Sequence, residues 1–237
     1  MRKSQQLSLT AIFAALHAIL YFESFGLWRN WGIYLAPLEG IILGPEIGFF
    51  AAFIGSSVAR AVFPVDFWMF GMLAEPISVL MAGFLAKSKW KPVLAVYALM
   101  LSAYFIHPFG RSLPLWTILD ILFAMLLVYP AAKYSGNLFK ADARRLSISV
   151  VLISFICIAT DSLVRVFLLV PCGLYGLFFK DFETLYTVFV GAAVNSYIED
   201  VIVVVVSFLV GVPLVISMSK LKLWKEARVG KKNREIP

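Results

Sequence analysis

Apolar stretches long enough to cross a membrane recur along the whole 237-residue chain, and they constrain its fold more than any other feature. A helical span needs ~20 predominantly apolar residues. Inside lipid the backbone must satisfy its own hydrogen bonds, which leaves only helices or a closed barrel. Barrel strands alternate apolar and polar residues over ~10 positions, whereas runs such as 201–206 are apolar throughout. The sequence therefore predicts an all-α, polytopic helical membrane protein.

Basic residues gather beside the apolar spans rather than across a surface. Most of the 21 lie in four clusters, at residues 2–3, 87–91, 133–145 and 220–234. Clusters of this kind mark the cytoplasmic side of a membrane protein, so both termini are predicted to be cytoplasmic. The net charge of +7 then reflects topology and attraction to anionic lipid, and it does not indicate a nucleic-acid partner.

Eight hydrophobic segments fit this topology. They are residues 7–25, 33–44, 46–63, 67–86, 92–106, 113–132, 146–170 and 184–220. Segment 33–44 is too short to cross alone, so it is expected to tilt or to unwind at Pro37. The last segment is too long for one perpendicular span, so its first dozen residues are expected along the outer surface. We predict about 6–8 transmembrane segments in one domain, 1–219, followed by a basic cytoplasmic tail, 220–237.

Charged side chains inside the spans predict a polar pocket, because each is expensive at membrane depth and normally faces protein or water. Asp161 and Arg165 stand four apart on one helix and are expected to pair with each other. Arg60 and Arg111 lack such a local partner, which makes them better candidates for binding a solute. The pocket candidates are Trp31, Glu39, Arg60, Glu75, His107, Arg111, Asp120, Asn195 and Glu199.

Arginines and aromatic rings in the predicted outer half favour a partly planar, anionic solute. The planar guanidinium suits carboxylate and phosphate. The rings of the outer loops form either an interfacial belt or a lid over the ligand. Only two histidines and two cysteines are present, so no metal site and no cofactor are predicted, and Cys157 is expected to be buried.

Small residues line one side of the first segment, at Ala11, Ala14, Ala15 and Ala18. Such strips let helices approach closely, either within one chain or against a partner. Together with the run 37–48, which contains Leu-Gly-Pro-Glu-Ile-Gly, the segment 9–18 resembles the substrate-capture (S) components of energy-coupling-factor (ECF) transporters. The resemblance covers about the first 90 residues. Members of that family usually have six helices, fewer than the eight segments counted here.

The resemblance implies a binding subunit rather than an enzyme. An outward pocket would capture a vitamin or related micronutrient in the plasma membrane. The alanine strip would contact a transmembrane coupling subunit driven by ATPase subunits. Two alternatives remain: an autonomous secondary transporter that uses Glu75, Glu199 or Asp200 as proton sites, and an intramembrane enzyme with chemistry at Cys157, His107 and Arg165.

Overall fold

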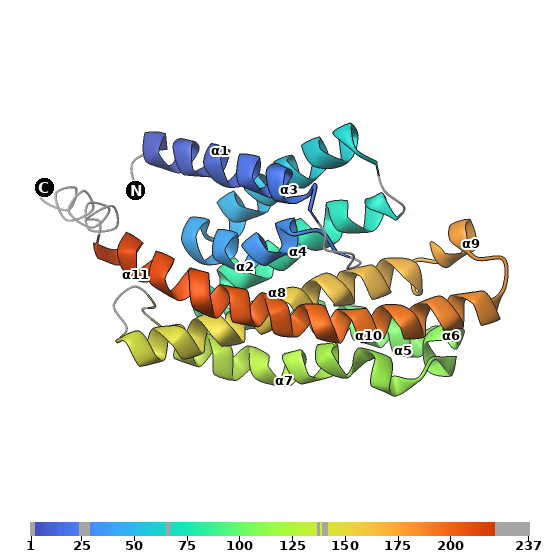
Figure 1. The fold of residues 1–237 in the computed structure, drawn as a ribbon. Helices are drawn as coiled ribbons and strands as arrows, with labels where there is room; N and C mark the ends of the chain where they lie inside the picture. Colours follow the sequence, from blue (N-terminus) through green and yellow to red (C-terminus); the bar gives the residue numbers. More distant parts are fainter. Residues whose placement is uncertain (1–2, 24–28, 65–66, 137, 139–141, 221–237) are drawn as a thin grey trace, which may run out of the picture.

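The computed structural model describes residues 3–23, 29–64, 67–136, 138 and 142–220, and every regular element within them is helical (Figure 1). The prediction of an all-α chain is confirmed. The main helices are α1 (Lys3–Leu20), α2 (Gly32–Leu43), α3 (Pro45–Val62), α4 (Trp68–Ala86), α5 (Trp90–Ile106), α7 (Leu119–Tyr134), α8 (Ala143–Leu169), α10 (Phe182–Val206) and α11 (Val212–Lys220). The shorter elements are α6 (Pro108–Ser112), η1 (Leu115–Ile118), α9 (Tyr175–Phe178) and the π-helical turn η3 (Ser207–Gly211).

Four helical stretches of the described residues are long and apolar enough to cross a membrane. They are Trp68–Ala86, Leu115–Tyr134, Ala143–Leu169 and Phe182–Ser219. Three further apolar helices are shorter, and α3 carries Glu46 and Arg60 at its two ends. The length and composition of these helices are compatible with a membrane protein. All but the first residue of the predicted tail, 220–237, lies outside the described residues.

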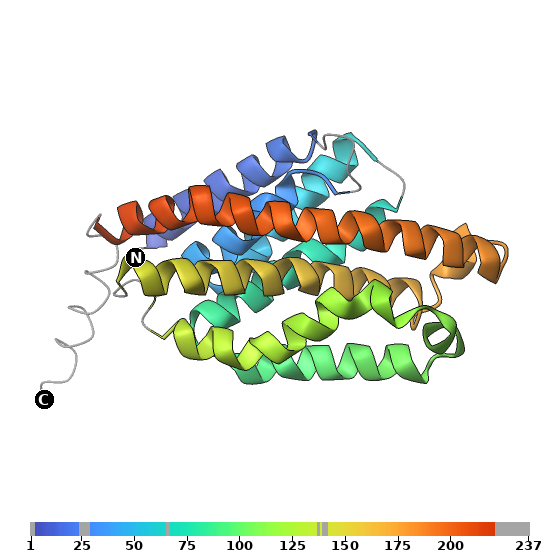
Figure 2. The same cartoon turned by 60° about the horizontal axis from the view of Figure 1, so that its bottom comes forward.

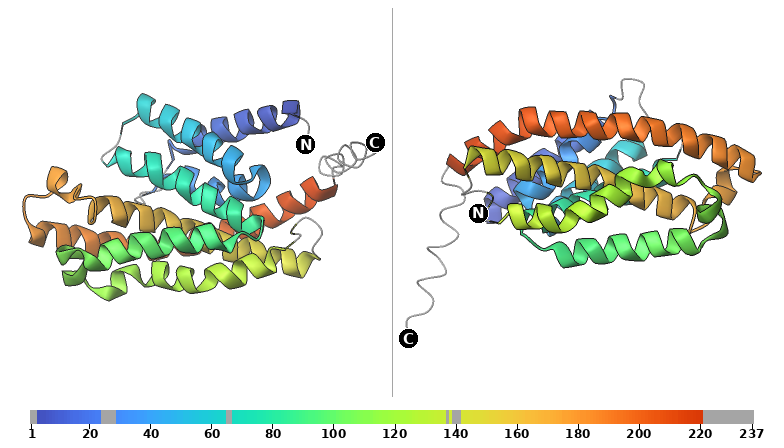
Figure 3. Two further views of the ribbon diagram at one scale, coloured as in Figure 1. Left: turned by 180° about the vertical axis from the view of Figure 1, so that it is seen from behind. Right: turned by 90° about the horizontal axis from the view of Figure 1, so that it is seen from below.

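Helix α8 runs through the middle of the bundle and is buried over most of its length. It packs against α4, α5, α7 and α10. Helices α1 and α3 form one flank, α5 and α7 form the opposite flank, and α10 lies along α8 (Figures 2 and 3). Charged side chains from both halves can therefore meet beside α8.

The two ends of the bundle differ in charge. The start of α1, the α4–α5 turn with Lys87, the α7–α8 connection with Lys133 and Arg145, and the end of α11 lie at one end, called here the basic end (Figure 1). The connections α3–α4, α5–α7 and α8–α10 lie at the other, called here the opposite end.

Local sequence signals explain several of the helix boundaries. Gly44 has a φ of 82°, which favours glycine, and Pro45 begins α3. Gly83 sits so close to the α2–α3 turn that an added Cβ would lie 2.4 Å from the backbone nitrogen of Pro45. Glycine at these two positions allows α2, α3 and α4 to pack tightly.

Two local expectations were wrong, and a third loses one of its two alternatives. Helix α2 continues through Pro37 without unwinding, which leaves a tilt as the expectation for this short segment. The first dozen residues of the last segment are part of the long helix α10, and η3 joins that helix to α11 without a break in helical backbone. Helix α1 ends at Leu20, five residues before the predicted boundary. Packing against neighbouring helices decides where a helix continues or ends, and the sequence of an isolated segment does not show that packing.

Candidate functional site

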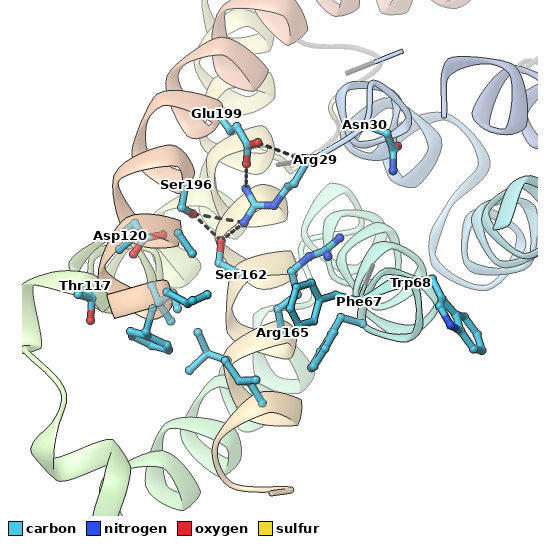
Figure 4. Close-up of a pocket in the computed structure, with 18 of the residues that line it drawn as sticks. Arg29, Asn30, Phe67, Trp68, Thr117, Asp120, Ser162, Arg165, Ser196 and Glu199 are labelled. Carbon is cyan, nitrogen blue, oxygen red and sulfur yellow. Dashed lines mark hydrogen bonds and ion pairs between the residues drawn. The ribbon is translucent and has the colours of Figure 1, made fainter. Parts of the chain in front are cut away.

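A cavity of about 550 Å³, partly open to the surroundings, lies near the opposite end of the bundle (Figure 4). Ligand pockets for small molecules have volumes of roughly this size. Its walls are mainly apolar and aromatic, with a few polar groups. The lining includes Tyr21, Phe22, Phe63, Phe67, Trp68, Phe70, Phe179 and Phe189, and the polar side chains Arg29, Asn30, Arg60, Thr117, Asp120, Ser162, Arg165, Ser196 and Glu199.

Arg29 reaches from the segment before α2 into the space between α8 and α10 (Figure 4). Its guanidinium forms ion pairs with Glu199 at 2.9 Å and with Asp161 at 3.0 Å. It also donates to the hydroxyl of Ser162 at 2.6 Å and to that of Ser196 at 3.3 Å. The backbone N–H of Arg29 donates to the second oxygen of Glu199 at 2.8 Å. Arg29 is 7% exposed, so this cluster ties the α1–α2 connection to two helices.

Glu75 on α4 is the centre of a second buried cluster. Arg60 on α3 binds both of its carboxylate oxygens, at 2.5 and 3.1 Å, in the two-pronged geometry that makes arginine–carboxylate pairs strong. His17 on α1 lies with Nε2 3.1 Å from Glu75 and with Nδ1 3.2 Å from Glu39 on α2. A carboxylate only accepts hydrogen bonds, so a ring facing carboxylates from both nitrogens is the doubly protonated imidazolium.

Arg165 on α8 joins the two clusters. Its Nε lies 2.6 Å from Asp161, as the four-residue spacing predicted, and its Nη2 lies 3.5 Å from Glu75. Eight side chains, buried except for the partly exposed Arg165, thus form one continuous network that connects six helices. They are Glu39, His17, Glu75, Arg60, Arg165, Asp161, Arg29 and Glu199.

Two further carboxyl groups stand beside this network without joining it. Asp120 on α7 and Asp200 on α10 are close enough that each affects the ionisation of the other. They are 6% and 3% exposed. Within the described part of the chain, Oδ1 of Asp120 and both carboxyl oxygens of Asp200 have no hydrogen-bond partner. Among the described residues, no basic nitrogen lies within 4 Å of either group.

The predicted site residues occupy three kinds of position. Arg60, Asp120 and Glu199 line the cavity, and Glu39 and Glu75 lie in the network that adjoins it. The other four predicted residues do not line the cavity. Trp31 is half-buried and Arg111 is exposed. The side chain of Asn195 donates to the carbonyl oxygen of Gly191, and that of His107 accepts from the N–H of Phe109 at the start of α6. The sequence offered Arg60 no local partner, and its carboxylate partner Glu75 comes from another helix, α4.

The small residues on α1 divide between two environments. Ala11 and Ala15 are exposed, Ala18 is half-buried, and Ala14 is buried. An added Cβ at Gly55 on α3 would lie 2.6 Å from the carbonyl oxygen of Ala14. One side of the strip therefore packs inside the chain, and the other side faces outward.

Sequence reasoning missed Arg29, His17, Ser162 and Ser196 as members of the site. Arg29 lies in a connection, and its partner Glu199 is 170 residues away in the chain. For His17 a signal was present, since it falls on the same helix as the small-residue strip and is fully buried. Cys157 is buried, as expected. In the described part of the chain, no group of three or more His, Cys, Asp or Glu side chains is placed to hold a metal ion.

No family model and no solved structure matches the chain. It is similar to an uncharacterized protein of Methanocaldococcus jannaschii, with 26% identity over 131 residues. The match covers 54% of this chain and 44% of the relative, so the chain spans less than half of that protein's length. The name of the relative states no activity, and the chemistry of the site must be argued from its residues.

Proposed function

We propose that the chain is the membrane-embedded substrate-binding subunit of an ECF-type uptake transporter for a vitamin or related micronutrient. The observation that supports this most is the cavity of about 550 Å³ near the opposite end, with aromatic walls and a few polar groups at fixed positions. A cavity of this kind suits reversible binding of one small molecule. The polar groups around it are held by ion pairs, which keeps the binding surface in one arrangement.

The proposed topology places the basic end in the cytoplasm and the cavity toward the outside. The described parts of the four basic clusters, at the start of α1, the α4–α5 turn, the end of α7 with the start of α8, and the end of α11, border one end of the bundle, as the positive-inside rule requires of cytoplasmic connections. The eight main helical segments then alternate in direction across the plasma membrane, with both termini cytoplasmic. At ~1.5 Å per residue, the 12 residues of α2 extend only about 18 Å, so this helix reaches the interior of the bundle rather than spanning alone.

The proposed cycle needs no chemistry in this chain. The cavity captures solute outside, and the subunit then docks on a transmembrane coupling subunit that ATPase subunits drive. Ala11 and Ala15, on the outward side of α1, are suited to close approach by a partner helix. We assign no cofactor to the chain.

Docking is tested by replacing both exposed alanines of α1 with phenylalanine, as Ala11→Phe/Ala15→Phe. The matched control is Ala95→Phe/Ala98→Phe, which places the same bulk on exposed positions of α5 on the other flank. A tagged chain expressed in its native membranes is purified, and its partners are identified by mass spectrometry. We expect the control to recover a membrane subunit and nucleotide-binding ATPase subunits, and the α1 variant to lose them.

Recovery of these subunits by neither the wild type nor the control would overturn the proposal. Equal recovery by the α1 variant would overturn the assignment of Ala11 and Ala15 while leaving the function standing.

The alternative is an autonomous secondary transporter that uses intramembrane carboxyl groups. Of the carboxyl groups named for that role, Glu75 and Glu199 are held in ion pairs with arginine, whereas Asp200 has no basic partner among the residues that the structure describes. Asp200 is therefore the observation that favours this alternative. Purified chain reconstituted alone into vesicles distinguishes the two: solute uptake driven by a pH gradient would support the secondary transporter, and uptake only with ATPase subunits would support the ECF-type subunit.

A further inference from the structure

Asp120 and Asp200 are left over when the buried charges are counted. The network contains four carboxylates, namely Glu39, Glu75, Asp161 and Glu199. Three arginines and the doubly protonated His17 balance them. The network is thus neutral by itself. The aspartate pair lies beside it with no basic group of its own among the described residues.

One proton on the two aspartates reduces their charge to a single negative charge. Two neighbouring buried carboxyl groups without a basic partner do not readily ionise together, because burial and the like charge both disfavour the second ionisation. Asp120 is in the first turn of α7, where the helix dipole favours a negative charge. Asp200 is well inside α10, where backbone N–H groups are already used by the helix. The proton therefore belongs on Asp200, and the negative charge belongs on Asp120.

Asp120 lines the cavity, whereas Asp200 does not. Asp120 is thus a negative charge at the wall of a largely apolar cavity. An uncompensated charge in such surroundings is unfavourable, and a ligand with one positive charge would neutralise it. The three arginines that line the same cavity are already engaged by carboxylates, so the charge left for a solute to match is negative rather than positive.

We propose that the Asp120–Asp200 pair is a recognition site for the single positive charge of a protonated amine on the captured solute. This inference rests on the proposed function and replaces the anionic solute that the arginine content favoured. An ammonium group has three N–H donors and is satisfied by few acceptors. A small inorganic cation needs more oxygen ligands. The hydroxyl of Thr117, also in the wall, already donates to the carbonyl oxygen of Pro114 at 2.6 Å.

The test measures binding of aromatic amines to the purified full chain by thermal shift and calorimetry at pH 7. The probes are 2-phenylethylamine and tryptamine. Each is compared with its neutral analogue, 2-phenylethanol or tryptophol, and with the acids 3-phenylpropionate and indole-3-acetate. We expect an amine to bind at least tenfold more tightly than its alcohol, and the acids to bind more weakly still.

Two variants separate the roles of the pair. Asp120→Asn removes the charge and is expected to weaken amine binding by about ten- to a hundredfold. Asp200→Asn replaces the protonated, neutral carboxyl group with a neutral amide outside the cavity wall and is expected to stay within about threefold of the wild type. Asp120→Glu, which keeps the charge, should retain the preference for amines. Glu46→Gln is the control, because it removes an exposed carboxylate that does not line the cavity.

Three results would overturn the proposal. The first is no preference for amines with either probe pair, and the second is an Asp120→Asn variant that binds amines like the wild type. The third is saturable stabilisation by NaCl over KCl that depends on Asp120 and excludes the amines. The last would assign the pair to an inorganic cation. If the chain prefers amines but never recovers coupling and ATPase subunits, the amine site stands and the proposed function is wrong. If it recovers them and binds amine and alcohol equally, only the amine site is wrong.

Discussion

Replacing Arg29 with methionine is expected to destabilise the protein more than any other single change at the cavity. Glu199 has no other basic partner among the described residues, so its carboxylate would be left buried and unpaired. Asp161 would keep only Arg165. Breaking a buried ion pair from one side costs about 3–5 kcal/mol. For a chain of this length, 1 kcal/mol shifts the melting temperature by about 2–4 °C, so the expected decrease is about 6–20 °C.

The assay is thermal unfolding of the purified chain in detergent, followed by tryptophan fluorescence. The control is Arg111→Met, which removes the same side chain from an exposed position at the opposite end and should stay within about 2 °C of the wild type. The double variant Arg29→Met/Glu199→Gln should recover part of the loss, because no unpaired charge then remains at position 199. An Arg29→Met protein with the same melting temperature as the Arg111→Met control would refute the reasoning.

Three further predictions concern packing, capping and topology. Gly83→Ala should lower stability by about 1–3 kcal/mol, because its Cβ would strike the backbone at the start of α3, whereas Gly191→Ala, with open space around it, should be neutral in the same melt. Asp181 accepts from the N–H of Thr184, which lowers the pKa of its carboxyl below 3.8. The melting temperature of Asp181→Ala should therefore fall below that of the wild type at pH 7, and the difference should vanish as pH drops through this depressed pKa. An impermeant maleimide should label exposed Cys172 in intact cells and leave buried Cys157 unlabelled, and labelling of Cys172 only after lysis would reverse the proposed topology.

Helix positions could be predicted from the sequence because the length and spacing of apolar runs are local properties. The Gly44-Pro45 turn and the Asp161–Arg165 pair were predictable for the same reason, since both depend on residues close in the chain. The boundary of α1 was not, because apolar residues continue beyond Leu20 and only contacts with other helices decide where the helix ends.

Much of the site could not be predicted, because its partners come from distant parts of the chain. Arg60 meets Glu75 across two helices, and Arg29 meets Glu199 across most of the sequence. The identities of the charged residues indicated that a polar cluster exists. Their pairing decides which charges are available to a solute, and it changes the expected solute from an anion to a cation.

Release of bound solute from the purified chain tests the central claim most directly. The wild type, Ala192→Trp and Val194→Trp are purified in parallel, and the small molecules that each releases on denaturation are quantified by mass spectrometry. Ala192 lines the cavity, whereas Val194 is exposed on the same helix and serves as the control. We expect one solute, close to one molecule per chain, from the wild type and from Val194→Trp, and none from Ala192→Trp. Equal retention by Ala192→Trp, or no retained solute in any of the three proteins, would contradict the account.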